Sequence, residues 1–158
     1  MTSNSDERYS RQVRLPEIGL AGQSILKKSK VLVVGLGGLG CPSSQYLVSA
    51  GIGNILLVDG DKIELSNIHR QPLFRESDIG KSKAETASRV LSKINSDVSI
   101  NFLNEYLSKS NAEDLISKVD IVIDGTDNID ARYLINKICS SMKKPWVHGS
   151  LRRFSGQV

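Results

Sequence analysis

The sequence predicts an α/β protein with a Rossmann-like, mostly parallel sheet, helices on both faces and a short helical segment in front of the first strand. Three observations predict this fold. Apolar runs of strand length alternate with helix-length segments along the 158 residues, which is typical of strands joined by helical crossovers. A glycine-rich turn directly follows the first apolar run, and the second run ends on an acid. A chain of this length is expected to form one domain.

The elements are predicted in chain order as an arm, residues 1–28, and a nucleotide-binding domain, residues 29–158. The arm contains two short helices, which Pro16 and two glycines separate. Strands are expected where apolar residues run together: 30–34, 54–59, 98–102, 121–124, 145–149 and a shortened strand in 151–158. Helices are expected at 40–50, 81–94, from Ser110 or Asn111 to Lys118, and at 129–141. Residues 60–80 have little apolar period, and a loop of this length in a compact domain is usually functional.

The glycine-rich turn has the spacing of a dinucleotide-binding loop. In Gly35-Leu-Gly37-Gly38-Leu-Gly40, the first glycine allows the tight turn and Gly37 leaves space for a phosphate, while Gly40 allows the helix to pack on the sheet. The amino end of the following helix directs backbone N–H groups and a positive dipole at an anion. Asp59, nineteen residues after Gly40, is placed to accept hydrogen bonds from ribose hydroxyls. The alternative is a turn whose glycines serve packing only.

Composition excludes several other classes of protein. The net charge is +4, which favours an acidic ligand or partner, but the basic residues are dispersed and no aromatic residues are interleaved with them, so we expect no nucleic-acid interface. The longest apolar stretches have strand length, so we expect no membrane span. Cys41 and Cys139 lack CxxC spacing and no signal peptide accompanies them. We therefore expect a cytoplasmic protein in which both cysteines are packing residues.

The loop after Asp59 is dense in groups that bind phosphate. Arg70 can hold two phosphate oxygens with its planar fork, and Lys83 supplies a point charge. Asn67 can donate to a phosphate or hold an attacking carboxylate. Each of these residues alone is more simply a solvated surface group, but together they favour a triphosphate site, which hydride transfer does not require.

A second polar segment, Asp124-Gly-Thr-Asp127-Asn128, follows the apolar run 121–123. The carboxyl end of a parallel strand opens onto the ligand crevice. Asp127 is therefore a candidate ligand for Mg²⁺, which takes one or two carboxylates together with phosphate oxygens. Asp127 and Asn128 are equally good candidates for the N-cap of the next helix, and the sequence leaves both roles open.

The chain resembles the ThiF/MoeB/HesA adenylyltransferases, the bacterial relatives of ubiquitin-activating enzymes. The resemblance extends from Arg8 over nearly the whole chain and rests on six motifs in order: Arg8-Tyr-Ser-Arg11-Gln12, Gly35 to Cys41, Asp59-Gly-Asp61, Leu65-Ser-Asn-Ile-His-Arg-Gln71, Gly80-Lys-Ser-Lys83 and Gly125-Thr-Asp-Asn128. It implies ATP-dependent adenylation of the C-terminal glycine of a small ubiquitin-like sulfur-carrier protein that ends in Gly-Gly.

The resemblance also implies roles for individual residues. Asp59 would bind the ATP ribose, and Asp61 belongs to the same motif and is placed in the cofactor site. The phosphates would be surrounded by four side chains, Asn67, Arg70, Gln71 and Lys83. Asp127 would bind Mg²⁺. Arg11 would reach across a dimer interface into the ATP site of the neighbouring subunit, so a homodimer is expected.

Members of this family usually continue beyond the equivalent of Val158, into a second half with zinc-binding CxxC pairs. No such pairs are present, so we interpret the chain as the adenylation half, with ATP and Mg²⁺ as cofactors and no zinc site. Molybdopterin and thiamine pathways share the motifs, so the carrier is not determined. The alternatives are an inactive nucleotide-binding or dimerisation module, an NAD-dependent oxidoreductase, and a tRNA-modifying dehydratase of the same superfamily.

Overall fold

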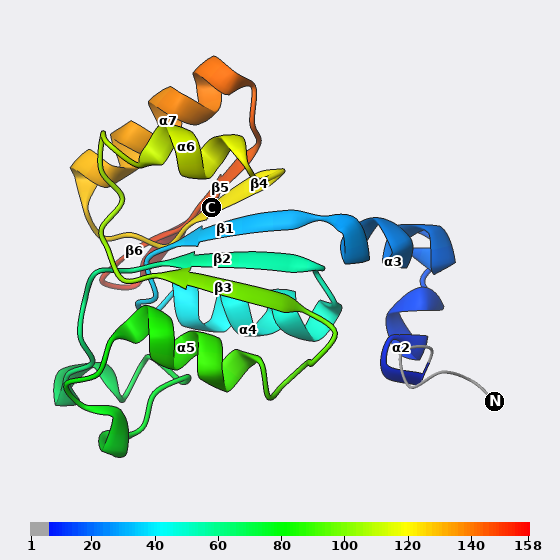
Figure 1. The fold of residues 1–158 in the computed structure, drawn as a ribbon, viewed down its shortest axis with the longest axis horizontal. Helices are drawn as coiled ribbons and strands as arrows, with labels where there is room; N and C mark the ends of the chain where they lie inside the picture. The colour runs from blue at the N-terminus through cyan, green and yellow to red at the C-terminus, as the bar shows by residue number, and fades with distance from the viewer. Residues whose placement is uncertain (1–6) are drawn as a thin grey trace.

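A computed structural model describes residues 7–158. Its main sheet has five parallel strands in the order β3-β2-β1-β4-β5, which confirms the predicted Rossmann-like class (Figure 1). The strands are β1 (Lys30–Val34), β2 (Asn54–Val58), β3 (Ser99–Leu103), β4 (Ile121–Asp124) and β5 (Trp146–His148). The crossover helices are α4 (Gly40–Ala50), α5 (Lys83–Leu91), α6 (Ala112–Ser117) and α7 (Ile129–Met142).

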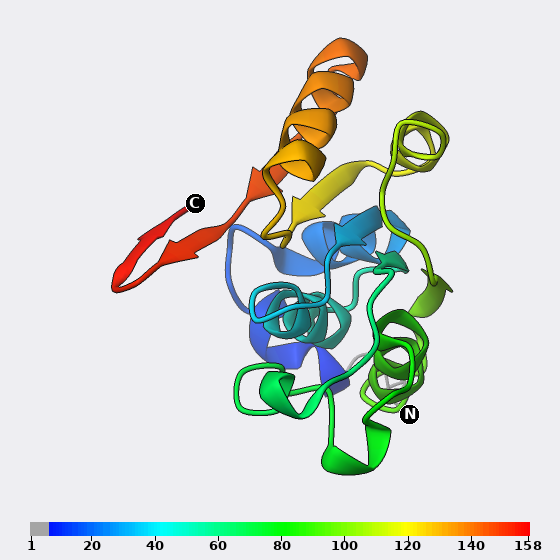
Figure 2. The same ribbon diagram turned by 90° about the vertical axis from the view of Figure 1, so that its left-hand side faces the viewer.

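Helices cover both faces of the sheet, and each face has its own apolar core (Figures 1 and 2). Val31 and Val33 of β1 pack with side chains of α4 and α5, whereas Leu32 and Val34 pack with those of α6 and α7. All four valine and leucine side chains are buried. This two-sided burial explains why the strand is a continuous apolar run rather than an alternating one.

The N-terminal arm contains α2 (Ser10–Val13) and α3 (Gly19–Lys28); residues 1–6 lie outside the described part of the chain. Figure 1 shows both helices beyond the amino ends of the strands, opposite the glycine loop. The arm contacts the domain through Gln12, whose Nε2 donates to the carbonyl of Ala50 at 2.8 Å. In addition, Asn95 Nδ2 donates to the hydroxyl of buried Tyr9 at 2.7 Å.

The connection after β2 contains more regular secondary structure than the sequence predicted. It contains two 3₁₀ turns, Leu65–Asn67 and Glu76–Asp78. Helix α5 begins at Lys83 instead of residue 81, because the chain before it is extended: the N–H of Ile63 donates to the carbonyl of Lys81. Ser82 then acts as N-cap, its Oγ accepting from the backbone of the first turn.

The last residues do not form the single shortened strand that we expected. They form a separate antiparallel hairpin of β6 (Ser150–Arg152) and β7 (Ser155–Gln157), and Figure 2 shows it extending away from the main sheet. The chain reverses at Arg153, which has a φ of 57°. Every residue from 151 to 158 is exposed, so no buried face selects one continuous strand here.

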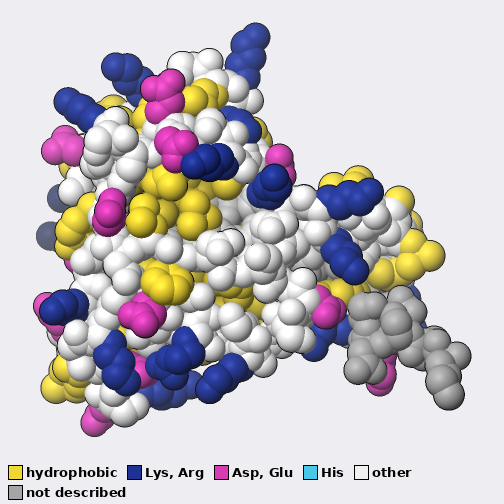
Figure 3. Space-filling model, viewed as in Figure 1, with side chains coloured by type: hydrophobic (Ala, Val, Ile, Leu, Met, Phe, Trp, Pro, Cys, Tyr) yellow, Lys and Arg dark blue, Asp and Glu magenta, His cyan; other side chains and the backbone are white. Residues whose placement is uncertain are grey.

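No helix within residues 7–158 combines the length and the apolar character needed to cross a membrane. Lys and Arg side chains are spread over the face shown in Figure 3, with Asp and Glu among them.

Candidate nucleotide-binding site

The glycine loop lies at the carboxyl end of β1 and is closely packed. Gly35 has a φ of 84°, a left-handed conformation that favours glycine. A Cβ on Gly40 would lie only 1.8 Å from the carbonyl oxygen of Gly35, so the start of α4 contacts the turn directly. Gly125, in the loop after β4, is also close, because a Cβ there would lie 3.0 Å from the N of Gly40. The two loops therefore form one surface at the carboxyl edge of the sheet.

Asp59 connects β2 to this loop. Its Oδ2 accepts the N–H of Leu36 at 2.6 Å, and its Oδ1 accepts the N–H of Asp61 at 2.7 Å. Burial raises the pKa of Asp59, and these two N–H donors oppose that shift. A carboxylate has about four acceptor positions, so two positions remain, and the binding of ribose hydroxyls by Asp59 stays a prediction.

Lys83 forms an ion pair with Asp61. The Nζ–Oδ2 distance is 2.8 Å, and the lysine side chain is buried. Partial burial raises the pKa of Asp61, but the hydrogen bonds from Lys83 and from the hydroxyl of Tyr106 outweigh it, so the pKa is lowered overall. Sequence reasoning missed Tyr106; its signal was an aromatic residue shortly after the strand 99–103. The ring lies against Gly60, where a Cβ would be 2.7 Å from a ring carbon.

Arg70 and Gln71 follow the first 3₁₀ turn and lie against the glycine loop. A Cβ on Gly38 would be 3.6 Å from Cδ of Arg70, and one on Gly37 would be 4.0 Å from Nε2 of Gln71. Arg70 is exposed, and its Nη1 donates to the carbonyl of Ser66 at 2.7 Å. Gln71 is buried, and its Oε1 has no hydrogen-bond partner in the described structure. A buried polar atom without a partner is uncommon; the atom of this amide that faces Gly37 is Nε2, which can donate to a phosphate oxygen.

Asn67 is also buried, but its Oδ1 accepts the N–H of Glu64 at 3.1 Å and closes the turn. Its Nδ2 contacts Ser66 Oγ at 3.3 Å. Asn67 therefore has a structural role in positioning the Arg70 segment, and its predicted contact with phosphate or carboxylate stays a prediction.

Of the two roles considered for Asp127, metal ligand and N-cap, the structure gives the N-cap role to its neighbour. Asn128 is the N-cap of α7, with its Oδ1 accepting the N–H groups of Asp130 at 2.8 Å and Ala131 at 3.2 Å. Asp127 is exposed. Within residues 7–158, no three acidic, His or Cys side chains are grouped as a metal cage. One carboxylate still suits Mg²⁺ that arrives with a nucleotide and takes its other ligands from phosphates and water.

Arg11 is not close to this site in its own subunit. It lies in α2, and α2 contacts Ala50, the last residue of α4, whereas the glycine loop adjoins Gly40 at the first residue. Helix α4 has 11 residues, so its two ends lie about 15 Å apart at ~1.5 Å per residue. The predicted role of Arg11 in the site of a neighbouring subunit stays a prediction.

Both cysteines are buried. Burial raises the pKa of Cys41 to about 12, and its Sγ donates to the carbonyl of Leu36 at 3.1 Å. Burial also raises the pKa of Cys139. A nucleophilic cysteine must form its thiolate near neutral pH, so both residues fit the predicted packing role.

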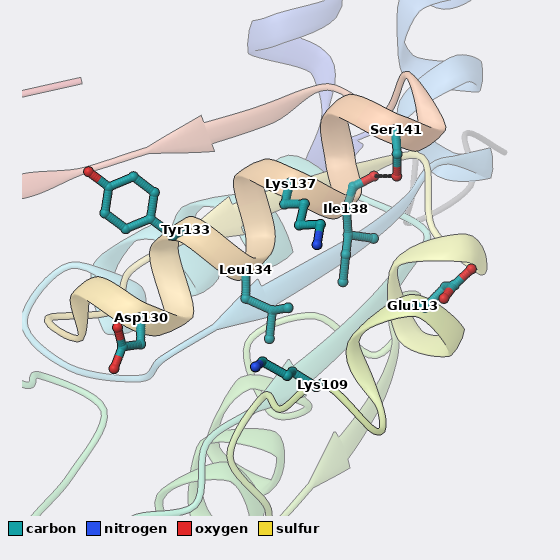
Figure 4. A pocket seen from close by; sticks show the side chains of 8 residues that line it. All are labelled: Lys109, Glu113, Asp130, Tyr133, Leu134, Lys137, Ile138 and Ser141. Carbon is teal, nitrogen blue, oxygen red and sulfur yellow. Dashed lines mark hydrogen bonds between the residues drawn. The ribbon is translucent and has the colours of Figure 1, made fainter.

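A groove of about 730 Å³ lies elsewhere, between α6 and α7 (Figure 4). Leu134 and Ile138 form its apolar part, and charged residues of both signs, such as Glu113 and Lys137, lie at its rim. None of the predicted nucleotide-site residues lines it. It is therefore separate from the crevice at the carboxyl edge of the sheet.

A parallel sheet with a glycine turn after β1, a buried acid after β2 and the side chains of Arg70 and Gln71 beside the turn defines a Rossmann-type nucleotide-binding domain. The model of the ThiF family matches residues 9–158. The chain belongs to the ThiF family.

Relatives and solved structures agree with this assignment. The chain is 46% identical over its full length to the adenylyltransferase and sulfurtransferase MOCS3 of Culex quinquefasciatus, and 46% identical over 155 residues to MOCS3 of Dictyostelium discoideum. The ATP complex of the E. coli tRNA N6-threonylcarbamoyladenosine dehydratase TcdA has a TM-score of 0.88 at 25% identity, covering 94% of this chain and 61% of that one. E. coli MccB with ATP has a TM-score of 0.78 at 33% identity, with coverages of 94% and 46%.

The two MOCS3 alignments include 98–100% of this chain but only 36% of the length of each relative.

Proposed function

We propose that the chain is the adenylation domain of an enzyme that activates a ubiquitin-like sulfur-carrier protein. The observation that carries the proposal is the contact of Arg70 and Gln71 with Gly37 and Gly38. This contact places the stem of a cationic side chain beside backbone that can approach a phosphate closely. Membership of the ThiF family and the adenylyltransferase name of the MOCS3 relatives support the same reaction.

In the proposed reaction, an oxygen of the carrier's terminal glycine carboxylate attacks the α-phosphorus of ATP. The bond between the α-phosphorus and the bridging oxygen breaks, so that acyl-adenylate forms and pyrophosphate leaves. No covalent enzyme intermediate is required. The protein's contribution is to position the reactants and to stabilise charge that develops on phosphate oxygens.

Four groups would supply that stabilisation. Arg70 would bind phosphate oxygens, and Lys83 would place its ammonium at the phosphates from its contact with Asp61. Mg²⁺ bound by Asp127 and the phosphates would neutralise further charge. Arg11 of a second subunit would complete the site, so we propose a homodimer with two shared sites.

The carrier would end in Gly-Gly and belong to molybdopterin or thiamine biosynthesis. Two buried free thiols favour the reducing cytoplasm as the location of the protein.

Ligand binding is the first test. We expect calorimetry in the presence of Mg²⁺ to show tighter binding of ATP than of NAD. Asp59→Ala should weaken ATP binding by roughly 1–3 kcal/mol, because the ribose hydroxyls and the N–H groups of Leu36 and Asp61 would lose their acceptor. Tighter binding of NAD than of ATP would contradict adenylation and favour an oxidoreductase.

Pyrophosphate exchange into ATP is the second test, performed with candidate carriers that end in Gly-Gly. Exchange that depends on the carrier is the expected result, and removal of its terminal glycine should abolish it. Because TcdA is similar in fold, tRNA should be assayed in parallel. Exchange or AMP release that depends on tRNA instead of a carrier would indicate a dehydratase, and ATP binding without either would indicate an inactive module.

Asp127 and Asn128 are expected to affect different properties. Asp127→Ala should remove most of the exchange activity with little change in melting temperature, since its side chain is exposed and does not cap α7. Asn128→Ala should cost about 0.5–2 kcal/mol of unfolding free energy, the usual effect of losing an N-cap. Thermal and denaturant unfolding of both variants, beside their exchange rates, would show the contrast. Normal exchange by Asp127→Ala would contradict the proposed metal role.

A further inference from the structure

A buried ionic cluster that the sequence did not reveal lies directly behind the Asp127 turn. Its centre is Asp124, the last residue of β4, whose side chain is fully buried. Oδ1 accepts the N–H of Thr126 at 3.0 Å and the hydroxyl of the same residue at 2.7 Å. Oδ2 lies 3.2 Å from Nδ1 of His148 and 3.6 Å from Nε of Arg132. His148 is the neighbour of Asp124 in the parallel register of β4 and β5.

Arg132 contacts the residue before the turn and a residue within it. Its Nε faces the Asp124 carboxylate in an ionic contact without a hydrogen bond, and its Nη2 donates to the carbonyl of Thr126 at 2.9 Å. Its side chain is about three-quarters buried, with 26% exposed. Arg132 lies in the first half of α7, so this one guanidinium connects the end of β4, the loop after it and the helix that the loop enters. A lysine could not make both contacts, because it lacks the planar fork.

The turn is in contact with the glycine loop on its other side. A Cβ on Gly35 would lie 3.0 Å from the carbonyl oxygen of Gly125, and the N–H of Gly125 donates to the carbonyl of Val34 at 2.9 Å. Backbone contacts therefore restrict the start of the turn. At its far end, Asn128 caps α7. Between these points, the conformation of the segment that carries Asp127 depends on Thr126, which Asp124 and Arg132 hold from both sides.

We propose that Arg132 is a positioning residue for nucleotide binding: through the Asp124 carboxylate and the Thr126 carbonyl, it fixes the turn 125–128 so that Asp127 stands where it can meet the phosphates and Mg²⁺. Arg132 itself need not touch the nucleotide. Because Asp127 matters only when a nucleotide is bound, this role rests on the proposed function. The alternative is a purely structural ion pair, whose loss would lower stability and leave the binding of a correctly folded protein unchanged.

A double-mutant cycle distinguishes these roles. The variants are Arg132→Gln, Asp127→Ala and the double variant, and the measurement is the Kd of ATP with and without Mg²⁺. We expect Arg132→Gln to weaken binding of ATP with Mg²⁺ by about five- to thirtyfold, which corresponds to a coupling of about 1–2 kcal/mol. In the Asp127→Ala background, Arg132→Gln should change the Kd of ATP little further. Arg132→Gln should also change the Kd of ATP little when Mg²⁺ is absent.

Two further variants separate positioning from folding. Arg132→Lys keeps the charge beside Asp124 but cannot also donate to Thr126, so it should recover stability and only part of the affinity. Lys137→Gln removes the same charge from an exposed position of α7 and should change neither. Hydrogen exchange of the Thr126 amide in the ligand-free protein should rise in Arg132→Gln and stay normal in Lys137→Gln.

Multiplicative loss of affinity in the double variant would overturn the proposal, since Arg132 would then act independently of Asp127. Unchanged affinity in a folded Arg132→Gln or Arg132→Lys protein would overturn it as well. If the wild-type protein bound no ATP, the proposed function would fail. The exchange of the Thr126 amide would then still decide whether Arg132 orders the turn.

Discussion

Alanine at Gly40 is expected to destabilise the protein by about 3 kcal/mol or more, whereas alanine at Gly37 should leave the fold nearly intact and impair ATP binding. The difference follows from what the added Cβ would meet. At Gly40 it would lie 1.8 Å from the carbonyl oxygen of Gly35, so the turn and the helix would have to separate. At Gly37 it would meet only Nε2 of Gln71, at 4.0 Å. This Cβ would occupy space where the backbone can approach a phosphate.

Denaturant unfolding and ATP calorimetry on the two variants would check this contrast. Gly80→Ala is the control without a steric clash. Gly80 has a φ of 84° and no atom within 4 Å of its Cβ position, so the stability lost in this variant measures backbone strain alone. Normal ATP affinity in a folded Gly37→Ala protein would show that the loop does not contact phosphates. A stable Gly40→Ala protein would contradict the close packing of helix and turn.

Mixing Arg11→Ala with Arg70→Ala should restore activity that each variant lacks alone. If the dimer shares its sites, a heterodimer contains one site with both arginines and one site with neither. Random assortment places about half of the subunits in heterodimers, so about a quarter of the wild-type sites should be intact. The reason lies in the fold: Arg11 is at the amino ends of the strands, at the opposite end of α4 from Gly40.

A matched control mixes Asp59→Ala with Arg70→Ala. Both residues belong to the crevice of one subunit, so no heterodimer contains an intact site and no activity should return. Restoration in the Arg11 mixture and not in the control would establish the shared site. If neither mixture recovered activity although heterodimers formed, Arg11 would not serve the partner's site, and a monomer by light scattering at working concentration would exclude the shared site altogether.

The surface of the N-terminal arm is consistent with such a dimer. Leu20 and Ile25 of α3 are 77% and 66% exposed, and apolar side chains are visible over this arm in Figure 3. In the proposed homodimer, a second subunit would cover them.

Local chemistry in the sequence determined much of the fold. The apolar run 30–34 became β1 with the same bounds, because it is buried on both faces of a parallel sheet. Helix α4 begins at Gly40 and ends at Ala50 as expected, since Gly40 allows the helix to start against the turn and Gly51, with a φ of 83°, ends it. The position of Asp59 after β2 was likewise predictable, because the order of strand, turn, helix and strand places it beside the glycine loop.

Contacts between distant segments required the tertiary structure. The sequence placed Arg70 and Lys83 in a functional loop. The packing of Arg70 against Gly38 and the ion pair of Lys83 with Asp61 depend on how residues 60–82 fold back towards the glycine loop. It left Asp127 and Asn128 as equal candidates for the N-cap, and backbone geometry assigned the cap to Asn128.

The cluster of Asp124, Arg132 and His148 was not detectable from spacing, because its members come from β4, α7 and β5 and meet only when the sheet assembles. The final hairpin was misjudged for the related reason that exposed residues carry no burial pattern to define a strand. Periodic burial and turn chemistry are local, so the sequence by itself determined the Rossmann-like scaffold and the kind of site. The partners of buried charges are set by contacts between remote segments, so only the tertiary structure decided how the side chains of that site are positioned.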